Sequence, residues 1–109
     1  MITKEVLSAV LNLKKCRDIE LLDSSLHYCF NKIDCSFINI HELAHKCKEW
    51  LYTNSMYEVI VNGTDVYLDS SDSLLAEGGF YYDMKFTADT EPEAVFKAAQ
   101  WVLDKVSNV

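Results

Sequence analysis

Residues 90–106 read TEPEAVFKAAQWVLDKV and carry the clearest structural signal in the chain. Thr90 and Glu93 have the spacing of a capping box, and Pro92 is tolerated between them because first-turn amides have no acceptor inside the helix. Behind this cap the apolar side chains recur at helical spacing. They are Val95, Ala98, Ala99, Val102 and Val106, widened by Phe96 and Leu103. We therefore predict a helix that begins after Thr90 and lies across a sheet.

The rest of the chain alternates between helical and strand patterns. Apolar spacing predicts one helix over residues 3–15 and another over residues 40–53, the second capped by Asn39. Short β-type runs predict strands over residues 18–22, 26–30, 57–61, 66–68 and 80–87. The sequence Asn62-Gly63-Thr64-Asp65 indicates a hairpin turn. Residues 31–38 are ambiguous, and residues 69–79 read as a polar loop.

These elements predict an α+β fold, with a small, mostly antiparallel sheet and about three helices packed against it. A chain of 109 residues, half of them hydrophobic, is expected to form a single domain over residues 1–109 and not to be disordered. There is no apolar run of the ~18 residues that a membrane span needs. The N-terminus lacks the pattern of a signal peptide. We therefore expect a cytoplasmic protein with no membrane partner.

The formal net charge of −7 argues against direct binding to nucleic acid, because phosphate contacts need clustered Lys and Arg. An acidic surface can instead occupy the basic groove of another protein, although acidity also simply keeps a small protein soluble. Asp65, Asp69 and Asp72 cluster near a predicted turn but lack the order of a calcium loop. Trp101 falls off the main apolar stripe of the last helix, where it either widens the core or marks a binding patch. These four residues are the candidate interaction surface.

The four cysteines are Cys16, Cys29, Cys35 and Cys47, and no C-x-x-C pair occurs. In a cytoplasmic protein we expect four reduced thiols. Cys47 lies on the apolar stripe of a helix and is expected in the core, and Cys29 is also expected to pack. A zinc site built from His27, Cys29, Cys35 and a later histidine can be drawn. Its spacing matches no standard zinc pattern, so this interpretation is not preferred.

Residues 41–45 read HELAH, which is the H-E-x-x-H pattern of zinc metallopeptidases. In such enzymes the two histidines, here His41 and His45, bind Zn²⁺, and the glutamate, here Glu42, is the general base for a zinc-bound water. The pattern has only three fixed positions and arises by chance. The chain has Lys48 and Leu51 where the extended metzincin motif has Gly and His, and no spacing singles out a third ligand.

The helical wheel favours a solvent-exposed face for this pattern. His41 and His45 lie about 140° from the mean direction of the apolar stripe of the same helix. With Asn39 as the cap, His41 also falls in the first turn, whereas zinc peptidases usually carry the motif well inside a helix. A zinc-dependent hydrolase is therefore the alternative hypothesis, and a chain without a cofactor is preferred.

Two segments carry a resemblance to known proteins. Residues 86–103, FTADTEPEAVFKAAQWVL, and residues 40–50, IHELAHKCKEW, resemble small uncharacterised phage, prophage and plasmid proteins. Those proteins end in a strand, a TEPEA turn and a KAxxWVL helix. The resemblance covers about 60 residues. It implies the context of a mobile genetic element and no particular activity, because the group has no common assigned mechanism.

The preferred functional hypothesis is a non-enzymatic, protein-binding accessory factor of a mobile element. Short acidic proteins of this kind often bind and block a protein of the host. We expect the partner to be a host protein or nucleoprotein complex, such as a defence enzyme that an anti-CRISPR-like inhibitor would occupy. A homodimer is left open. Contact would run through an acidic or aromatic surface.

Overall fold

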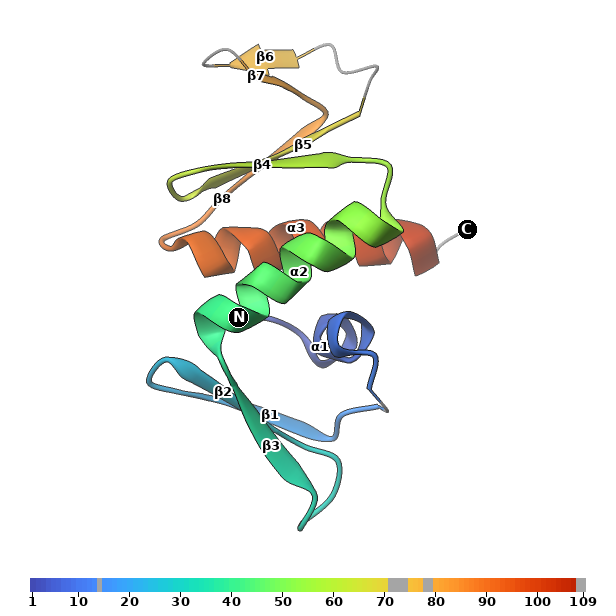
Figure 1. Cartoon of the computed structure of the whole chain (residues 1–109), viewed down its shortest axis with the longest axis vertical. Coiled ribbons are helices and arrows are strands. Elements are labelled where there is room, and N and C mark those ends of the chain that lie inside the picture. Colours follow the sequence, from blue (N-terminus) through green and yellow to red (C-terminus); the bar gives the residue numbers. More distant parts are fainter. Residues whose placement is uncertain (14, 71–74, 78–79, 108–109) are drawn as a thin grey trace.

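The computed structural model describes residues 1–13, 15–70, 75–77 and 80–107, and over these it is an α+β fold, as predicted. Three helices accompany two three-stranded antiparallel sheets and a two-stranded ribbon (Figure 1). The helices are α1 (Lys4–Leu11), α2 (Ile40–Asn54) and α3 (Glu91–Ser107). The strands are β1 (Asp18–Leu22), β2 (Ser25–Cys29), β3 (Cys35–Asn39), β4 (Glu58–Asn62), β5 (Asp65–Asp69), β6 (Leu75–Glu77), β7 (Phe80–Tyr82) and β8 (Met84–Thr87).

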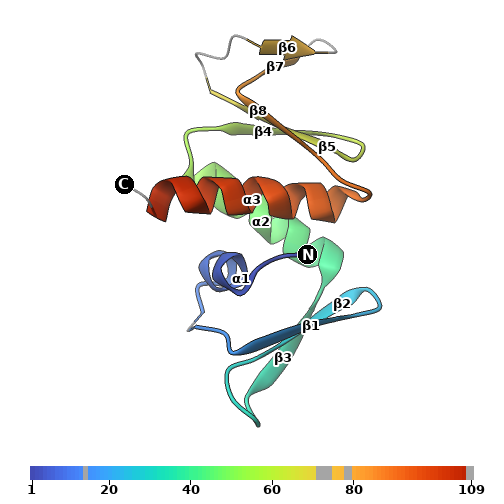
Figure 2. The same ribbon diagram turned by 180° about the vertical axis from the view of Figure 1, so that it is seen from behind.

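The helices form a central layer between the two sheets. Figure 1 shows α2 crossing α3, with the β1-β2-β3 sheet and α1 at one end of the molecule and the β4-β5-β8 sheet at the other. Figure 2 shows the same arrangement from behind, with α3 in front of α2. This stacking along one axis gives principal extents of 49 × 32 × 16 Å.

The strands are divided between two sheets, whereas the sequence suggested one. The first sheet has the order β1-β2-β3, and its last strand passes directly into α2. Asn39 makes this junction, because it ends β3 and its side chain also accepts hydrogen bonds from the backbone amides of His41 and Glu42. A strand that continues into a helix leaves the sheet plane at once. The first sheet therefore cannot continue into the β4-β5-β8 sheet, which lies beyond the helices.

Helix α3 is capped largely as predicted. The Thr90 hydroxyl accepts a hydrogen bond from the Glu93 amide at 3.4 Å. The Glu93 carboxylate lies 3.0 Å from the N-terminal ammonium of Met1 and pairs with it. Lys48 of α2 forms a 2.6 Å ion pair with Glu91, which links the first turn of α3 to the middle of α2.

One contiguous core joins both sheets through the helices. Its side chains come from all three helices and from strands of both sheets, and the largest of them that are fully buried are Leu7, Leu26, Leu43, Leu51, Leu68, Val6, Val66, Val95, Val102, Cys16 and Cys47. Ala94, Ala98 and Ala99 are also buried on α3. Their small side chains let α2 approach closely, which is the reason that the apolar stripe of α3 contains so much alanine.

Several boundaries differ from the sequence-based predictions. Helix α1 ends at Leu11, four residues early, because Asn12 adopts a left-handed conformation (φ 53°) that caps the helix. The ambiguous residues 31–38 include most of β3. The single strand predicted over residues 80–87 is interrupted at Asp83, which separates β7 from β8. Residues 75–77 form β6, inside the segment that was expected to be a loop.

Leu43 of α2 tests the central core. The Leu43→Ala variant is expected to lose about 3 kcal/mol of unfolding free energy, because it removes a fully buried side chain and leaves a cavity. The matched control is Leu22→Ala, since Leu22 is exposed on β1 and its truncation should change stability by no more than about 0.5 kcal/mol. Chemical denaturation of the two variants measures the difference. Equal losses would contradict a core centred on α2.

Candidate functional site

The HELAH segment lies on the solvent side of α2. Helix α2 begins at Ile40, so His41 is in the first turn, and His41, Glu42 and His45 are all exposed. The buried side chains of the same helix, Leu43, Ala44, Cys47 and Leu51, face the core. The placement of this pattern on an outer helical face, predicted from the wheel, is confirmed. The imidazole of His45 lies 2.9 Å from the carboxylate of Glu49, one turn further along.

No third protein ligand joins the two histidines in the part of the chain that the structure describes. Over those residues, no group of three or more His, Cys, Asp or Glu side chains is arranged to hold a metal ion. Lys48, one turn from His45, is paired with Glu91. The geometry around His41 and His45 therefore supports a solvated, charged helix face.

Of the four residues of the predicted interaction surface, the structure describes three, and it places Trp101 apart from Asp65 and Asp69. Asp65 and Asp69 lie at the two ends of β5, and Asp65 accepts a 2.7 Å hydrogen bond from the Thr87 hydroxyl. Strand alternation puts both carboxylates on the face of the sheet opposite to Val66 and Leu68, which pack into the core. Asp72 lies outside the described residues.

Trp101 is half-buried and lies on the core side of that sheet. Its ring contacts Phe86 at 6.1 Å and Tyr57 at 5.6 Å between centroids. The Lys105 ammonium lies 4.1 Å from the centre of the Trp101 ring, in a cation–π contact. Of the two roles considered for Trp101, this packing fits the one that widens the core. A shallow groove of about 490 Å³ beside it is bordered by both signs of charge, from Glu93, Lys97 and Asp104.

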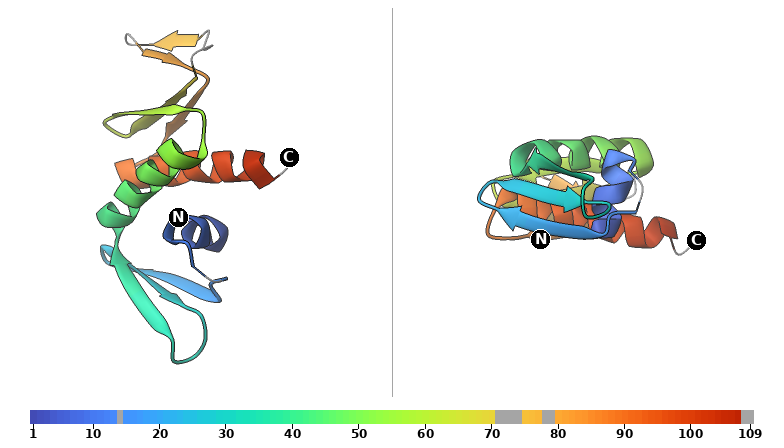
Figure 3. Two further views of the ribbon diagram at one scale, coloured as in Figure 1. Left: turned by 45° about the vertical axis from the view of Figure 1, so that its right-hand side comes forward. Right: turned by 90° about the horizontal axis from the view of Figure 1, so that it is seen from below.

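The outer face of the β1-β2-β3 sheet presents a surface that the sequence did not reveal. Strand alternation sends Leu26 and Ile38 into the core and their neighbours in sequence to the opposite face. We call this opposite face the hairpin face. It comprises Asp18, Glu20, Leu22, His27, Phe37 and the Cys29–Cys35 pair. Figure 3, right, views the molecule from this end, and no described element lies over the three strands.

The hairpin face has an aromatic centre. His27 and Phe37 are cross-strand partners, and their rings stack with centroids 5.6 Å apart and an interplanar angle of 25°. Phe37 is 68% exposed even so. Glu20 is the partner of His27 on the other side, in β1. The sequence does contain a signal for this face, in the alternations His27-x-Cys29 and Cys35-x-Phe37. Once β2 and β3 are in register, the side chains of these four residues lie on the same face of the sheet.

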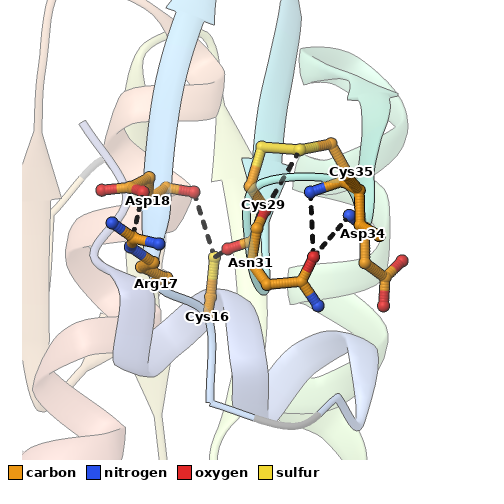
Figure 4. The surroundings of a disulfide bond; sticks show 8 residues. Cys16, Arg17, Asp18, Cys29, Asn31, Asp34 and Cys35 are labelled. Carbon is orange, nitrogen blue, oxygen red and sulfur yellow. Dashed lines mark hydrogen bonds and ion pairs between the residues drawn. A yellow bond between two sulfur atoms is a disulfide. The ribbon is translucent and has the colours of Figure 1, made fainter.

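A disulfide between Cys29 and Cys35 closes the tip of the hairpin (Figure 4). The expectation of four reduced thiols was wrong for these two cysteines, because the β2–β3 register makes them direct cross-strand partners with Cα atoms 4.0 Å apart. The loop is also held without the disulfide. The Asn31 side chain accepts hydrogen bonds from the amides of Ile33 and Asp34, and the Phe30 amide donates to the Asp34 carbonyl at 2.9 Å.

The remaining two cysteines are free and buried, as Cys47 was predicted to be. The Cys16 thiol donates toward the backbone carbonyls of Asp18 and Cys29 at 3.2 and 3.5 Å, so it lies beside the start of β1 and the end of β2 (Figure 4). Burial raises the pKa of the Cys47 thiol from 9.0 to about 12. The Cys47 thiol is therefore a packing group and not a nucleophile.

No protein family, curated protein or solved structure matches this chain. The resemblance of residues 40–50 and 86–103 to proteins of mobile elements stays a prediction. Within the described residues, no helix combines the length and apolar character required to cross a bilayer. The function is therefore argued from the geometry of the hairpin face.

The disulfide can be tested by counting thiols and by measuring stability. Alkylation of the unfolded, unreduced protein should label the two free cysteines, and all four after reduction. The Cys29→Ser/Cys35→Ser double variant should lose about 2 kcal/mol of unfolding free energy, the amount expected for a short closed loop. Mass spectrometry and denaturation measure these outcomes. Four labelled thiols without reduction would contradict the disulfide.

The raised pKa of Cys47 predicts a pH-dependent contribution to stability. In the unfolded chain the thiol ionises near 9.0, whereas in the folded chain it stays protonated up to about 12. The unfolded state therefore binds fewer protons across this window, and stability falls as pH rises through it. Cys47→Ala lacks this loss, so the stability of the wild type relative to the variant should decline above pH 9.0. A pH-independent difference, measured by denaturation, would contradict the assignment.

Proposed function

We propose that this protein is a non-enzymatic binding protein that docks through the hairpin face onto a basic and partly apolar surface of another protein. The observation that carries the proposal is a set of three large apolar side chains left in solvent on the first sheet and on the loop that joins β2 to β3. Ile33 in this loop is 93% exposed, Phe37 is 68% exposed and Leu22 is 44% exposed. Large aromatic side chains on an uncovered face are the usual anchors of protein interfaces.

The charge around these side chains supports a basic partner. Residues 17–39 carry the four carboxylates of Asp18, Glu20, Asp23 and Asp34, against two cations, Arg17 and Lys32. Arg17 lies 3.4 Å from Asp18 and offsets that carboxylate locally. The whole chain, these residues included, has a net charge of −7, which attracts a positively charged partner over longer distances.

The proposed partner class is a nucleoprotein enzyme of the host cell, and the proposed role is that of an inhibitor encoded by a mobile element. A groove that binds nucleic acid offers the positive charge that an acidic docking face complements. The mobile-element context is supported by the sequence resemblance. The zinc-hydrolase alternative receives no comparable support, since the exposed His41 and His45 have no convergent third ligand among the described residues.

The docking proposal is tested by cross-linking followed by affinity measurement. A photo-reactive amino acid at position 37, compared with one at position 56, should capture the partner in host cells selectively. Met56 is the matched control, because it is 90% exposed but lies outside the hairpin face. With the purified partner, Phe37→Ala should weaken binding by about 2 kcal/mol, which is roughly thirtyfold in Kd, and Met56→Ala should change it less than about threefold.

Salt dependence separates the acidic docking mode from a purely apolar one. Calorimetry should show that affinity falls as ionic strength rises, and that Glu20→Gln flattens this dependence without unfolding the chain. Equal losses for Phe37→Ala and Met56→Ala would remove the hairpin face from the interface. Affinity that does not change with salt would remove the basic partner.

A further inference from the structure

We infer that, once the Cys29–Cys35 disulfide is reduced, Cys29, Cys35 and His27 form a three-ligand site for Zn²⁺ on the outer side of the first sheet. This site is separate from the HELAH segment on α2 and goes beyond the docking proposal. Two thiolates and one imidazole form a sulfur and nitrogen ligand set. Such a set suits Zn²⁺, whereas Mg²⁺ and Ca²⁺ prefer oxygen ligands.

The sheet register places the three side chains together. Cys29 and Cys35 are cross-strand partners, and the disulfide between them establishes that both sulfurs lie on the same face. The next cross-strand pair on the same face, two residues further from the tip, is His27 and Phe37, whose rings stack on one another. His27 and Cys29 are two residues apart in one strand, so they share a face at a spacing of roughly 7 Å. A histidine side chain is long enough to reach back across this distance.

The two sulfurs suit a single tetrahedral ion. Zinc bonds to sulfur are about 2.3 Å long, so two thiolates on one ion lie roughly 3.8 Å apart. Cysteines whose Cα atoms are 4.0 Å apart can provide this separation by a rotation about each Cα–Cβ bond. With His27 as the third ligand, the fourth position is left to water.

The hairpin has backbone and side-chain hydrogen bonds that do not involve the disulfide. Asn31 accepts two backbone hydrogen bonds inside the loop, at 2.9 and 2.8 Å, and Phe30 donates to the Asp34 carbonyl. The β2–β3 ladder continues through Ser25 and Asn39 at the other end. Cys29 and Cys35 therefore stay opposite one another as thiols, so the ligands are already arranged before metal binds.

Each step of the conversion is balanced. Two molecules of a monothiol, or one of a dithiol, supply two electrons and two protons. The Cys29–Cys35 sulfur–sulfur bond breaks, a sulfur–sulfur bond forms in the oxidised reductant, and each cysteine becomes a thiol. Zinc then displaces the two thiol protons to solvent as it binds the thiolates. The oxidised chain lacks both thiolate ligands, because the two sulfurs are bonded to each other.

Cobalt titration tests this inference directly. The chain is reduced with a phosphine, kept free of oxygen and titrated with Co²⁺, whose thiolate charge-transfer and tetrahedral d–d absorption bands report the ligands. We expect one Co²⁺ per reduced chain, displaced by Zn²⁺, and no such bands for the oxidised chain. Cys35→Ser should abolish the charge-transfer bands of a two-thiolate site. His27→Ala should weaken Co²⁺ binding by at least about tenfold. Mutating a residue that only hydrogen-bonds to a metal ligand already lowers metal affinity by about that factor.

His45→Ala is the matched control, because it removes an exposed histidine from α2 and leaves the sheet intact. This variant should bind Co²⁺ as tightly as the wild type. Circular dichroism verifies that each variant is folded, which is expected for Cys35→Ser because Cys35 is exposed. The inference is overturned if the reduced wild type shows no thiolate bands. It is also overturned if His27→Ala binds like the wild type, or if His45→Ala weakens binding as much as His27→Ala does.

Discussion

The contact between α2 and α3 holds the two ends of the molecule together. Neither sheet is large enough to bury its own apolar face, because three short strands provide only one side of a core. Both faces are buried against the same helical layer, in which Leu43, Cys47 and Leu51 meet the alanine-rich stripe of α3. The ion pair of Lys48 and Glu91 links the two helices at the margin of this contact. A change in this layer is therefore transmitted to both sheets.

This arrangement leaves one sheet face without a cover. The helices occupy the space between the sheets, so the inner face of each sheet is buried. On the β4-β5-β8 sheet, Tyr67 is on the outer face and is nonetheless buried, with the ring of Tyr82 from β7 5.2 Å away. The first sheet has no equivalent among the described residues, and Phe37 stays in solvent. The docking proposal follows from this difference between the two sheets.

The hairpin face combines groups that can respond to the redox state of their surroundings. Its disulfide, imidazole and phenyl ring lie in two adjacent cross-strand rows. His27 stacks on Phe37 in the disulfide form and would turn toward the sulfurs to bind a metal ion. The proposed metal ligand His27 is therefore in contact with Phe37, the anchor proposed for docking. By contrast, HELAH has the spacing of a catalytic motif but lies on an exposed helix face, and among the described residues no third ligand converges on it.

The sequence by itself determined the three helices, the hairpin at Asn62-Gly63 and the α+β class. The signals behind them are local: the Thr90 cap, the apolar spacing of α2 and α3, and the turn at Asn62-Gly63 act over a few residues. Because these signals are local, they did not predict features that depend on distant segments. A left-handed Asn12 and a strand within residues 31–38 depend on what the neighbouring segments pack against. The division into two sheets follows from the direct passage of β3 into α2.

The candidate site was decided by the tertiary structure. Periodicity placed His41 and His45 outside the core correctly, but it carried no information about whether other ligands approach them. The pairing of Cys29 with Cys35, and of His27 with Phe37, depends on the β2–β3 register. If that register shifted by one residue, Cys29 and Cys35 would no longer be cross-strand partners on one face, and neither would His27 and Phe37. Register is fixed by burying Leu26 and Ile38 against the helices, and that burial exists only once the whole chain has folded.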